Sequence, residues 1–304
     1  MHDVDKQLRI GVVGFGEVGR ILCAALQPQG LAWLGAWDLL FADAAQGPPL
    51  AATARASGVQ PCASLVQLLE HADIVISAVT AANAHDVASA SAATIRRGSY
   101  FFDLNSASPE AKVRCAALID AKGAHYVEAG VMTSVPPYGI AVPMVVGGKH
   151  AGALAAKLAP LGFSMEIVAE KIGVASAIKM CRSIIIKGME AIVIESYTAA
   201  RHHGVETRVL DSLRETYPGF DWEKQGAYFF SRVAKHGRRR AEEMREAAHT
   251  VEDCGFEPFM AAATSDKQAY VAALAKSGLF SNVAGDDWRD YADRIIADSR
   301  AKPR

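Results

Sequence analysis

Short, nearly uninterrupted runs of apolar residues alternate with alanine-rich stretches along the first half of the chain. The runs have the length of strands and few polar residues at alternate positions, a pattern typical of strands buried on both faces of a parallel sheet. The predicted strands are residues 8–13, 32–37, 74–79, 100–104, 125–128, 144–146 and 163–168, and the helices between them include 18–26, 84–97 and 109–121. The first half is therefore predicted to be a doubly wound, mostly parallel α/β sheet covered by helices on both faces.

The pattern changes after about residue 170, where strand-like runs end. Residues 172–203 contain no proline and predict one helix of about 30 residues, which would be about 45 Å long. Further predicted helices are residues 207–216, 221–234, 238–253, 258–277 and 286–297. We therefore expect an all-α domain led by a long helix, with residues 1–171 and 172–304 as the two domains.

Composition and charge narrow the class of protein. Of 304 residues, 51% are hydrophobic and 21% are charged, which is typical of a globular chain, and the formal net charge of −1 gives no overall attraction to nucleic acid or anionic membranes. The most apolar stretch, residues 184–194, is interrupted by Lys187 and Glu190 and is too short to span a membrane. The odd number of cysteines, 5, predicts free thiols, and the polar N-terminus is unlike a signal peptide. We expect a cytoplasmic protein without a metal site.

A glycine motif, Gly14-x-Gly16-x-x-Gly19, follows the first predicted strand and opens a predicted helix. This context is typical of a Rossmann dinucleotide-binding domain, in which the glycines permit a tight turn, close approach of the pyrophosphate and close helix packing. The other interpretation is an ordinary glycine-rich turn. The predicted cofactor-binding residues are Gly14, Phe15, Gly16, Glu17, Val18, Asp38, Val79, Thr80 and Asn105.

Asp38 ends the second predicted strand, at the position where a carboxylate can accept hydrogen bonds from the ribose hydroxyls. It would repel a 2′-phosphate, and the apolar residues that follow offer no cation for that group. We expect NAD as the cofactor, with NADP as the second possibility.

Lys179 is the leading candidate for acid/base chemistry. It lies among small and apolar residues near the start of the long predicted helix, where burial would lower its pKa toward the range that a base needs at neutral pH. Ser183 follows one turn later on the same helix face. From these residues alone, an exposed lysine on an amphipathic helix is the competing interpretation.

Several segments in order resemble the β-hydroxyacid dehydrogenase and 6-phosphogluconate dehydrogenase superfamily. They are the glycine motif, the Asp-Leu-Asn-Ser turn at 103–109, the segment 128–134, the strand end 145–148 and the glycine-led helix that carries Lys179. The resemblance implies that Lys179 is the catalytic lysine and that residues 79–80 and 105 lie near the nicotinamide. It also implies that Met132, Thr133 and Ser134 bind the substrate.

Two positions depart from the superfamily pattern. Ser183 stands where the superfamily usually has Asn, four residues after the lysine, and Met132-Thr133-Ser134 replaces Ser-Gly-Gly. Both positions touch substrate in the superfamily, so we expect a substrate other than the usual 3-hydroxyisobutyrate type. Residues 236–246 resemble a poorly characterised branch with a phosphogluconate-dehydrogenase-like C-terminal helical domain.

Arginines complete the predicted substrate site. Residues 238–246 contain Arg-Glu pairs at i,i+4 spacing, which are typical of a solvated, ion-paired helix face. Alternatively, one arginine binds an anionic substrate through a bidentate contact. Arg239 and Arg182 are the candidates for that role.

The sequence thus predicts an NAD(P)-dependent oxidoreductase that oxidises a 3-hydroxy carboxylate, or reduces the matching carbonyl, with Lys179 as acid/base and Ser183 orienting the reacting group. Imine reduction and a catalytically idle NAD-binding sensor are the alternatives. The apolar residues on several sides of the long helix predict a homodimer built on the helical domain.

Overall fold

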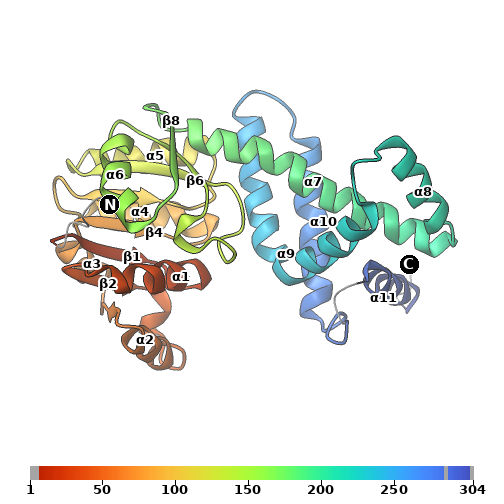
Figure 1. Cartoon of the computed structure of the whole chain (residues 1–304), viewed down its shortest axis with the longest axis horizontal. Helices are drawn as coiled ribbons and strands as arrows, with labels where there is room; N and C mark the ends of the chain where they lie inside the picture. Colours follow the sequence, from red (N-terminus) through yellow and green to blue (C-terminus); the bar gives the residue numbers. More distant parts are fainter. Residues whose placement is uncertain (1–6, 284–286, 302–304) are drawn as a thin grey trace. The chain divides into compact units, whose positions relative to one another are not determined.

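The structure is a computed structural model that describes residues 7–283 and 287–301 (Figure 1). Its contacts divide the chain into two compact units, residues 1–180 and 181–304, which are described separately below. The helix α7 begins in the first unit and continues into the second. The domain boundary at residues 171 and 172 stays a prediction.

The first unit is built on an eight-stranded sheet with the order β3-β2-β1-β4-β5-β6-β7-β8. Neighbouring strands are parallel except β6 and β7, which are antiparallel. The strands are β1 (Arg9–Val13), β2 (Trp33–Trp37), β3 (Gln60–Pro61), β4 (Ile74–Ser77), β5 (Tyr100–Asp103), β6 (His125–Val131), β7 (Met144–Gly147) and β8 (Met165–Ala169). The helices are α1 (Glu17–Leu26), α2 (Gly47–Ala56), α3 (Leu65–His71), α4 (Ala84–Ala92), α5 (Pro109–Asp120) and α6 (Ala151–Leu158).

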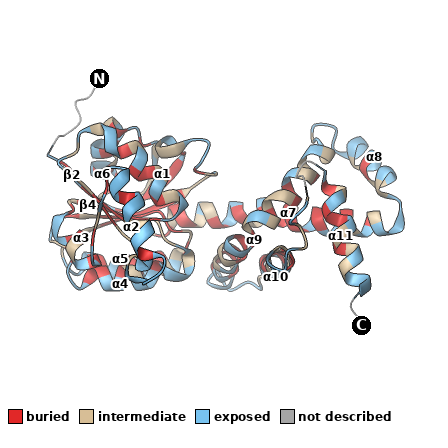
Figure 2. Ribbon diagram, turned by 90° about the horizontal axis from the view of Figure 1, so that it is seen from below, coloured by how far each residue is buried: buried red, intermediate tan, exposed pale blue. Residues whose placement is uncertain are grey.

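Helices cover both faces of this sheet, as Figure 2 shows. Because side chains alternate along a strand, Ile10 and Val12 of β1 pack into the core shared with α1 and α6. Val13 faces the opposite core, which α3, α4 and α5 cover. Both cores are apolar, which explains why the strands have few polar positions.

The predicted doubly wound, mostly parallel sheet followed by a helical region is confirmed. All seven predicted strands are present, with ends that agree to within three residues. The prediction missed β3, which has two residues, and the short helices α2, α3 and α6. A two-residue strand has too few positions to show a period, so its pairing comes from the sheet rather than from its own sequence.

The second unit consists of helices joined by short loops, with no strand among its described residues. It contains most of α7 (Val174–His203) together with α8 (Glu206–Thr216), α9 (Trp222–Glu252), α10 (Phe259–Lys276) and α11 (Trp288–Ala301). Aromatic and aliphatic residues of all five helices form its core, with the buried ring of Trp288 among the largest side chains. No helix among the described residues is long and apolar enough to cross a membrane.

The sequence predicted two helices, residues 221–234 and 238–253, where the structure has the single helix α9, so this prediction is wrong. Gly237 lies in the predicted gap between these two helices, and it packs against α10 instead. A Cβ atom at Gly237 would lie 2.9 Å from the backbone oxygen of Gln268 in α10. The glycine therefore lets α9 and α10 approach closely without ending the helix.

Candidate active site

The glycine motif forms a tight turn between β1 and α1. Gly14 has a φ of 95°, a conformation that favours glycine, and its N–H donates to the Trp37 carbonyl at 2.9 Å. A Cβ at Gly19 would come 1.9 Å from the Gly14 oxygen, so only glycine lets α1 start so close to the turn. These are the roles that a dinucleotide-binding turn requires of its first and third glycines.

The start of α1 has the features that a pyrophosphate needs. Gly16 is the N-cap residue, no side chain caps the helix, and no atom lies within 4 Å of where a Gly16 Cβ would stand. The first N–H groups of the helix therefore remain available to an anion. Glu17 and Val18 begin this helix, while the Phe15 ring is buried and packs near Phe41. The residues present thus fit a bound dinucleotide.

Asp38 connects the glycine turn to the end of β2. Its Oδ2 accepts a hydrogen bond from the Phe15 N–H at 2.7 Å, and its Oδ1 accepts one from the Leu40 N–H at 2.9 Å. Each carboxylate oxygen has a further lone pair, so these bonds leave acceptor capacity for ribose hydroxyls. Asp38 therefore holds the turn and keeps a negative charge at its rim.

Asn105 joins the carboxyl ends of β4 and β5. Its Oδ1 accepts from the Val79 N–H at 2.7 Å, its Nδ2 donates to Ser77 Oγ at 2.9 Å, and the residue is 3% exposed. Thr80, just beyond, is exposed. The sequence-predicted residues 79, 80 and 105 therefore meet at one edge of the sheet, with Asn105 supporting the backbone there.

A fully buried ion pair lies directly behind this turn. Lys112 Nζ of α5 is 2.9 Å from Asp103 Oδ1 at the end of β5, and both side chains are 0% exposed. Tyr126 of β6 donates its hydroxyl to Asp103 Oδ2 at 2.6 Å. Burial, and then the Asp103 carboxylate, raise the pKa of the Tyr126 hydroxyl well above its ordinary value, so it remains a donor. Sequence reasoning missed this cluster, whose members are far apart in the chain.

Glu128 of β6 holds the start of α7. Its buried carboxylate accepts hydrogen bonds from the N–H groups of Gly173 at 2.7 Å and Ala175 at 3.1 Å, and from Ser176 Oγ at 2.8 Å. A carboxylate at this end of a helix satisfies unpaired N–H groups and opposes the positive end of the dipole. Gly130, two residues on, brings strand and helix together, because its Cβ would lie 3.2 Å from Lys179 Cβ.

The contacts of Glu128 and Gly130 with the start of α7 also position Lys179, which lies in the second turn of this helix. Its Nζ donates to Ser106 Oγ at 2.5 Å, and Ser106 follows Asn105 in the turn after β5. The lysine is neither fully exposed nor fully buried. The predicted cofactor turn and the predicted catalytic lysine therefore share a direct hydrogen bond.

The predicted substrate segment continues from β6. Thr133 is exposed, Met132 and Ser134 are half-buried, and the Met132 N–H donates to the Pro143 carbonyl at 3.0 Å. The segment thus lies beyond the carboxyl end of β6, whose backbone also carries Glu128 and Gly130.

The remaining predicted residues lie in the second unit. Arg182 is exposed, and Ser183 is buried with its Oγ 3.2 Å from Lys187 Nζ. Arg239 is 45% exposed and lies 3.8 Å from Glu243, the i,i+4 pairing that the solvated-face interpretation expected. The buried arginine of this helix is its neighbour Arg240, which pairs with Glu190 of α7. Sequence reasoning missed Arg240 and Lys187, although charges inside the apolar stretch of α7 were a visible signal.

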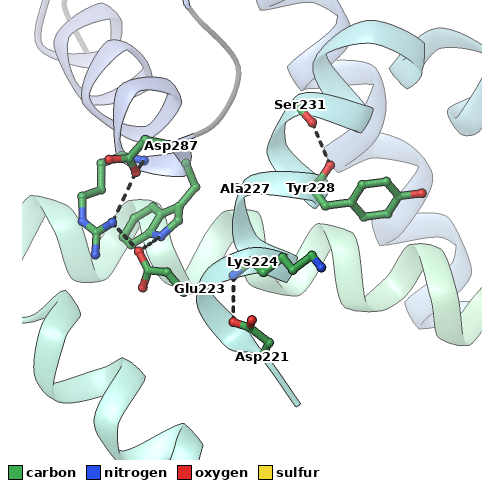
Figure 3. A pocket seen from close by; sticks show the side chains of 9 residues that line it. Asp221, Glu223, Lys224, Ala227, Tyr228, Ser231 and Asp287 are labelled. Atoms are coloured by element: carbon green, nitrogen blue, oxygen red, sulfur yellow. Dashed lines mark hydrogen bonds and ion pairs between the residues drawn. The ribbon is translucent and has the colours of Figure 1, made fainter.

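A cavity of about 590 Å³ lies elsewhere in the second unit, between the starts of α9 and α11 (Figure 3). Glu223 and Arg289 pair at its wall, and none of the predicted site residues lines it. Nor do any three His, Cys, Asp or Glu side chains gather as metal ligands within residues 7–283 and 287–301. The chemistry-bearing groups named above therefore do not belong to this cavity.

Two family models match separate parts of the chain. Residues 9–159 match the NAD binding domain of 6-phosphogluconate dehydrogenase, and residues 200–271 match a domain of unknown function (DUF1932). The first match spans the glycine turn and the sheet, and the second lies within the helical unit.

Solved structures match most of the chain. A conserved hypothetical protein from Sinorhizobium meliloti is 36% identical, with 97% of this chain and 98% of that chain covered and a TM-score of 0.75. A conserved protein of unknown function, described as structurally similar to 3-hydroxyacid dehydrogenases, is 29% identical over 88% of this chain and 99% of that chain, with a TM-score of 0.66. The Mycobacterium tuberculosis 3-hydroxyisobutyrate dehydrogenase with L-serine is 17% identical over 95% and 99% of the two chains, with a TM-score of 0.67, and shares the fold.

Proposed function

This chain belongs to the superfamily of β-hydroxyacid dehydrogenases and 6-phosphogluconate dehydrogenases, and from that premise we propose that it oxidises a 3-hydroxy carboxylate with NAD, or reduces the matching carbonyl. Its first unit is an NAD-binding domain. We also propose that the enzyme acts in the cytoplasm on a small anionic substrate.

The hydrogen bond between Lys179 and Ser106 is the observation that carries this proposal. It places an amine beside the turn after β5, at the carboxyl edge of the sheet, where open α/β sheets bind their ligands. Glu128 fixes the start of the helix that bears the lysine. A base within reach of the substrate hydroxyl is what this reaction requires.

In the proposed oxidation, Lys179 as a neutral amine takes the proton of the substrate hydroxyl while the hydride leaves the same carbon. The bound nicotinamide would supply the hydride acceptor. The C–H and O–H bonds break, a C=O bond forms, and Lys179 later releases its proton to solvent. Thr133 and Ser134 supply hydroxyl and backbone donors for the carboxylate, and Arg182 or Arg239 adds positive charge.

A substrate panel tests this proposal. We expect NADH to form from NAD with at least one of four compounds, 3-hydroxypropionate, 3-hydroxyisobutyrate, glycerate and L-serine. The rise in NADH absorbance at neutral pH measures the reaction. If the protein reduces cyclic imines with NADPH and oxidises none of these compounds, the proposal is wrong and imine reduction is the function. Binding of NADH without turnover of any compound would instead indicate a sensor.

Cofactor preference provides a separate prediction. NADH is expected to bind at least about tenfold more tightly than NADPH, because a like-charge contact between Asp38 and the 2′-phosphate is costly. Asp38→Ser should narrow that ratio, whereas Asp43→Asn, a change of an exposed acid in the same segment, should leave it unchanged. Calorimetry with both nucleotides measures the ratio, and tighter NADPH binding by the unaltered protein contradicts the prediction.

We further propose a homodimer, because α7 carries a stripe of exposed isoleucines. Ile178, Ile185 and Ile192 are spaced seven residues apart and are 38%, 65% and 55% exposed. Residues at this spacing lie on one side of a helix, and such a stripe is typical of a surface that packs against another helix.

Light scattering tests the dimer. The protein is expected to have twice the mass of one chain at micromolar concentration, and Ile185→Glu with Ile192→Glu should yield monomers because buried carboxylates would oppose association. Ile167→Glu, at a 51% exposed position of β8, is the matched control and should remain dimeric. A monomeric unaltered protein refutes the proposal.

A further inference from the structure

The polar cluster at the end of β5, formed by Asp103, Lys112 and Tyr126, has no part in the proposed mechanism. All three side chains are fully buried, so none of them can touch a cofactor or a substrate. Lys112 Nζ is 2.9 Å from Asp103 Oδ1 and also donates to the Asp103 carbonyl at 3.1 Å. Any effect of this cluster on the reaction must therefore pass through another residue.

Stability alone does not account for the buried ion pair of this cluster. Such a pair is often no more stabilising than apolar side chains of the same size, because desolvation offsets the attraction of the charges. The two oxygens of Asp103 instead serve separate donors. Oδ1 accepts from the Asn105 N–H at 2.9 Å as well as from Lys112, and Oδ2 accepts from the Tyr126 hydroxyl at 2.6 Å. The carboxylate thus joins the ion pair to the backbone of the turn after β5.

Tyr126 fixes the plane of the Asp103 carboxylate. The torsion that rotates a carboxylate about its last bond has broad minima, so a single contact does not define that plane. A carboxylate only accepts hydrogen bonds, so the Tyr126 hydroxyl must donate. The ring that carries this hydroxyl is stacked on Phe101 of β5, with centroids 5.9 Å apart and planes 12° apart. The bond at Oδ2 therefore keeps Oδ1 on the Asn105 N–H.

Asn105 extends this constraint to the neighbouring strand and to the lysine. Its side chain accepts from the Val79 N–H at 2.7 Å and donates to Ser77 Oγ at 2.9 Å. Ser77 ends β4, and Val79 lies just beyond it. The next residue of the turn, Ser106, accepts from Lys179 Nζ at 2.5 Å. One turn, anchored from behind by the carboxylate, therefore joins the backbone after β4 to the predicted catalytic lysine.

The strand order indicates which half of a dinucleotide meets this turn. The glycine turn that fits the pyrophosphate follows β1, and β2, with Asp38 after its last residue, lies on one side of β1. β4 and β5 lie on the other side. The two halves of a dinucleotide extend in opposite directions from the pyrophosphate along the carboxyl edge of such a sheet. The adenosine half therefore belongs at Asp38 and the nicotinamide half at the turn after β5.

We propose that Tyr126 is a positioning residue, which acts through the Asp103 carboxylate to hold the turn at 105 and 106 in the conformation that receives the nicotinamide half of the cofactor. The inference rests on the proposed function, because that reaction requires a nicotinamide held at this turn. A misplacement of the reacting groups by about 1 Å can cost about 10²-fold in rate, so the support behind them must be rigid. Lys112 balances the charge of the carboxylate and lets it stay buried.

Tyr126→Phe tests the inference, because it removes one hydroxyl and keeps the ring stacked on Phe101. The full-length protein is titrated with NADH and with ADP-ribose, which lacks the nicotinamide, and calorimetry measures both dissociation constants. Kd for NADH is expected to rise about 3- to 10-fold, the effect of losing one hydrogen bond. Kd for ADP-ribose should stay within about twofold, which also shows that the glycine turn is folded. Turnover of the hydroxy acid should fall about tenfold or more.

Two further variants separate positioning from general support of the sheet. Tyr100→Phe removes a hydroxyl at the opposite end of β5 and should leave both dissociation constants unchanged. Asp103→Asn should raise Kd for NADH at least as much as Tyr126→Phe does. Because Tyr126 acts through Asp103, the double variant should bind NADH no more weakly than Asp103→Asn alone.

The outcomes distinguish the inference from its premise. If Tyr126→Phe leaves the ratio of the two dissociation constants unchanged, the inference is wrong, whether both affinities stay the same or fall together. A selective loss of NADH affinity supports it. An unaltered protein that oxidises no acid of the panel overturns the proposed function, whereas the ratio of the dissociation constants needs no turnover and still decides the inference.

Discussion

Lys179→Met is expected to lower the turnover of the hydroxy acid by about 10²–10⁴-fold, the usual scale for a lost general acid or base. The methionine keeps the length and apolar stem of the lysine and removes its titrating group. Because Ser106 would lose only one donor, the turn after β5 should keep its other hydrogen bonds through Asn105. Steady-state kinetics with a saturating concentration of NAD measures the effect.

Intact folding and cofactor binding make this result interpretable. NADH affinity should change by less than about threefold and the melting temperature by less than about 2 °C, as expected for a partly exposed residue away from the packed cores. Lys171→Met changes an exposed lysine just before α7 and serves as the matched control. Near-normal turnover in Lys179→Met would show that the lysine has no part in the chemistry.

The second large effect is expected in stability. Lys112→Met leaves the fully buried Asp103 carboxylate without its ion-pair partner, although Tyr126 and the Asn105 N–H still donate to it. Breaking a buried pair from one side costs about 3–5 kcal/mol, which corresponds to a fall in melting temperature of roughly 6–20 °C for a unit of this size. Calorimetry or circular dichroism measures the fall.

A double variant separates lost charge from lost packing. Asp103→Leu together with Lys112→Met removes both charges and should recover part of the stability, because two apolar side chains can replace a buried ion pair. Lys157→Met, at an exposed position of α6, should melt as the unaltered protein does. If the melting temperature of the Lys112→Met protein falls by less than about 2 °C, other groups must stabilise the buried Asp103 carboxylate.

Features that arise from local spacing were predictable from the sequence. The glycine turn needs specific residues within six positions, and the buried strands need only apolar residues, so both left clear patterns. The long helix α7 followed from the absence of proline and agrees with its prediction to within two residues. Resemblance to the superfamily, rather than periodicity, singled out Lys179.

Features that arise from contacts between distant segments were not predictable in this way. Lys112 has the sequence surroundings of an ordinary surface lysine on a helix, and only the pairing of β5 with β6 brings Asp103 and Tyr126 to it. The gap predicted between residues 234 and 238 was wrong, and the close approach of Gly237 to α10 is invisible in its own segment. Glu128 was visible as part of a motif, but its role depends on where α7 begins.

The capping of α7 by Glu128 also sets an order of events during folding. The N–H groups that the carboxylate accepts belong to residues 45–48 positions later in the chain, so this contact closes a long loop. Closing such a loop is costly until other contacts have brought its ends together, and the pairing of β6 with β5 and β7 supplies them. Because β6 precedes α7 in the chain, the carboxylate that caps the helix is made before the N–H groups that it accepts. Lys179 would therefore be among the last groups of the first unit to reach its position. Opening of the sheet at β6 would release the lysine and the helix start together, as one cooperative unit in native-state hydrogen exchange.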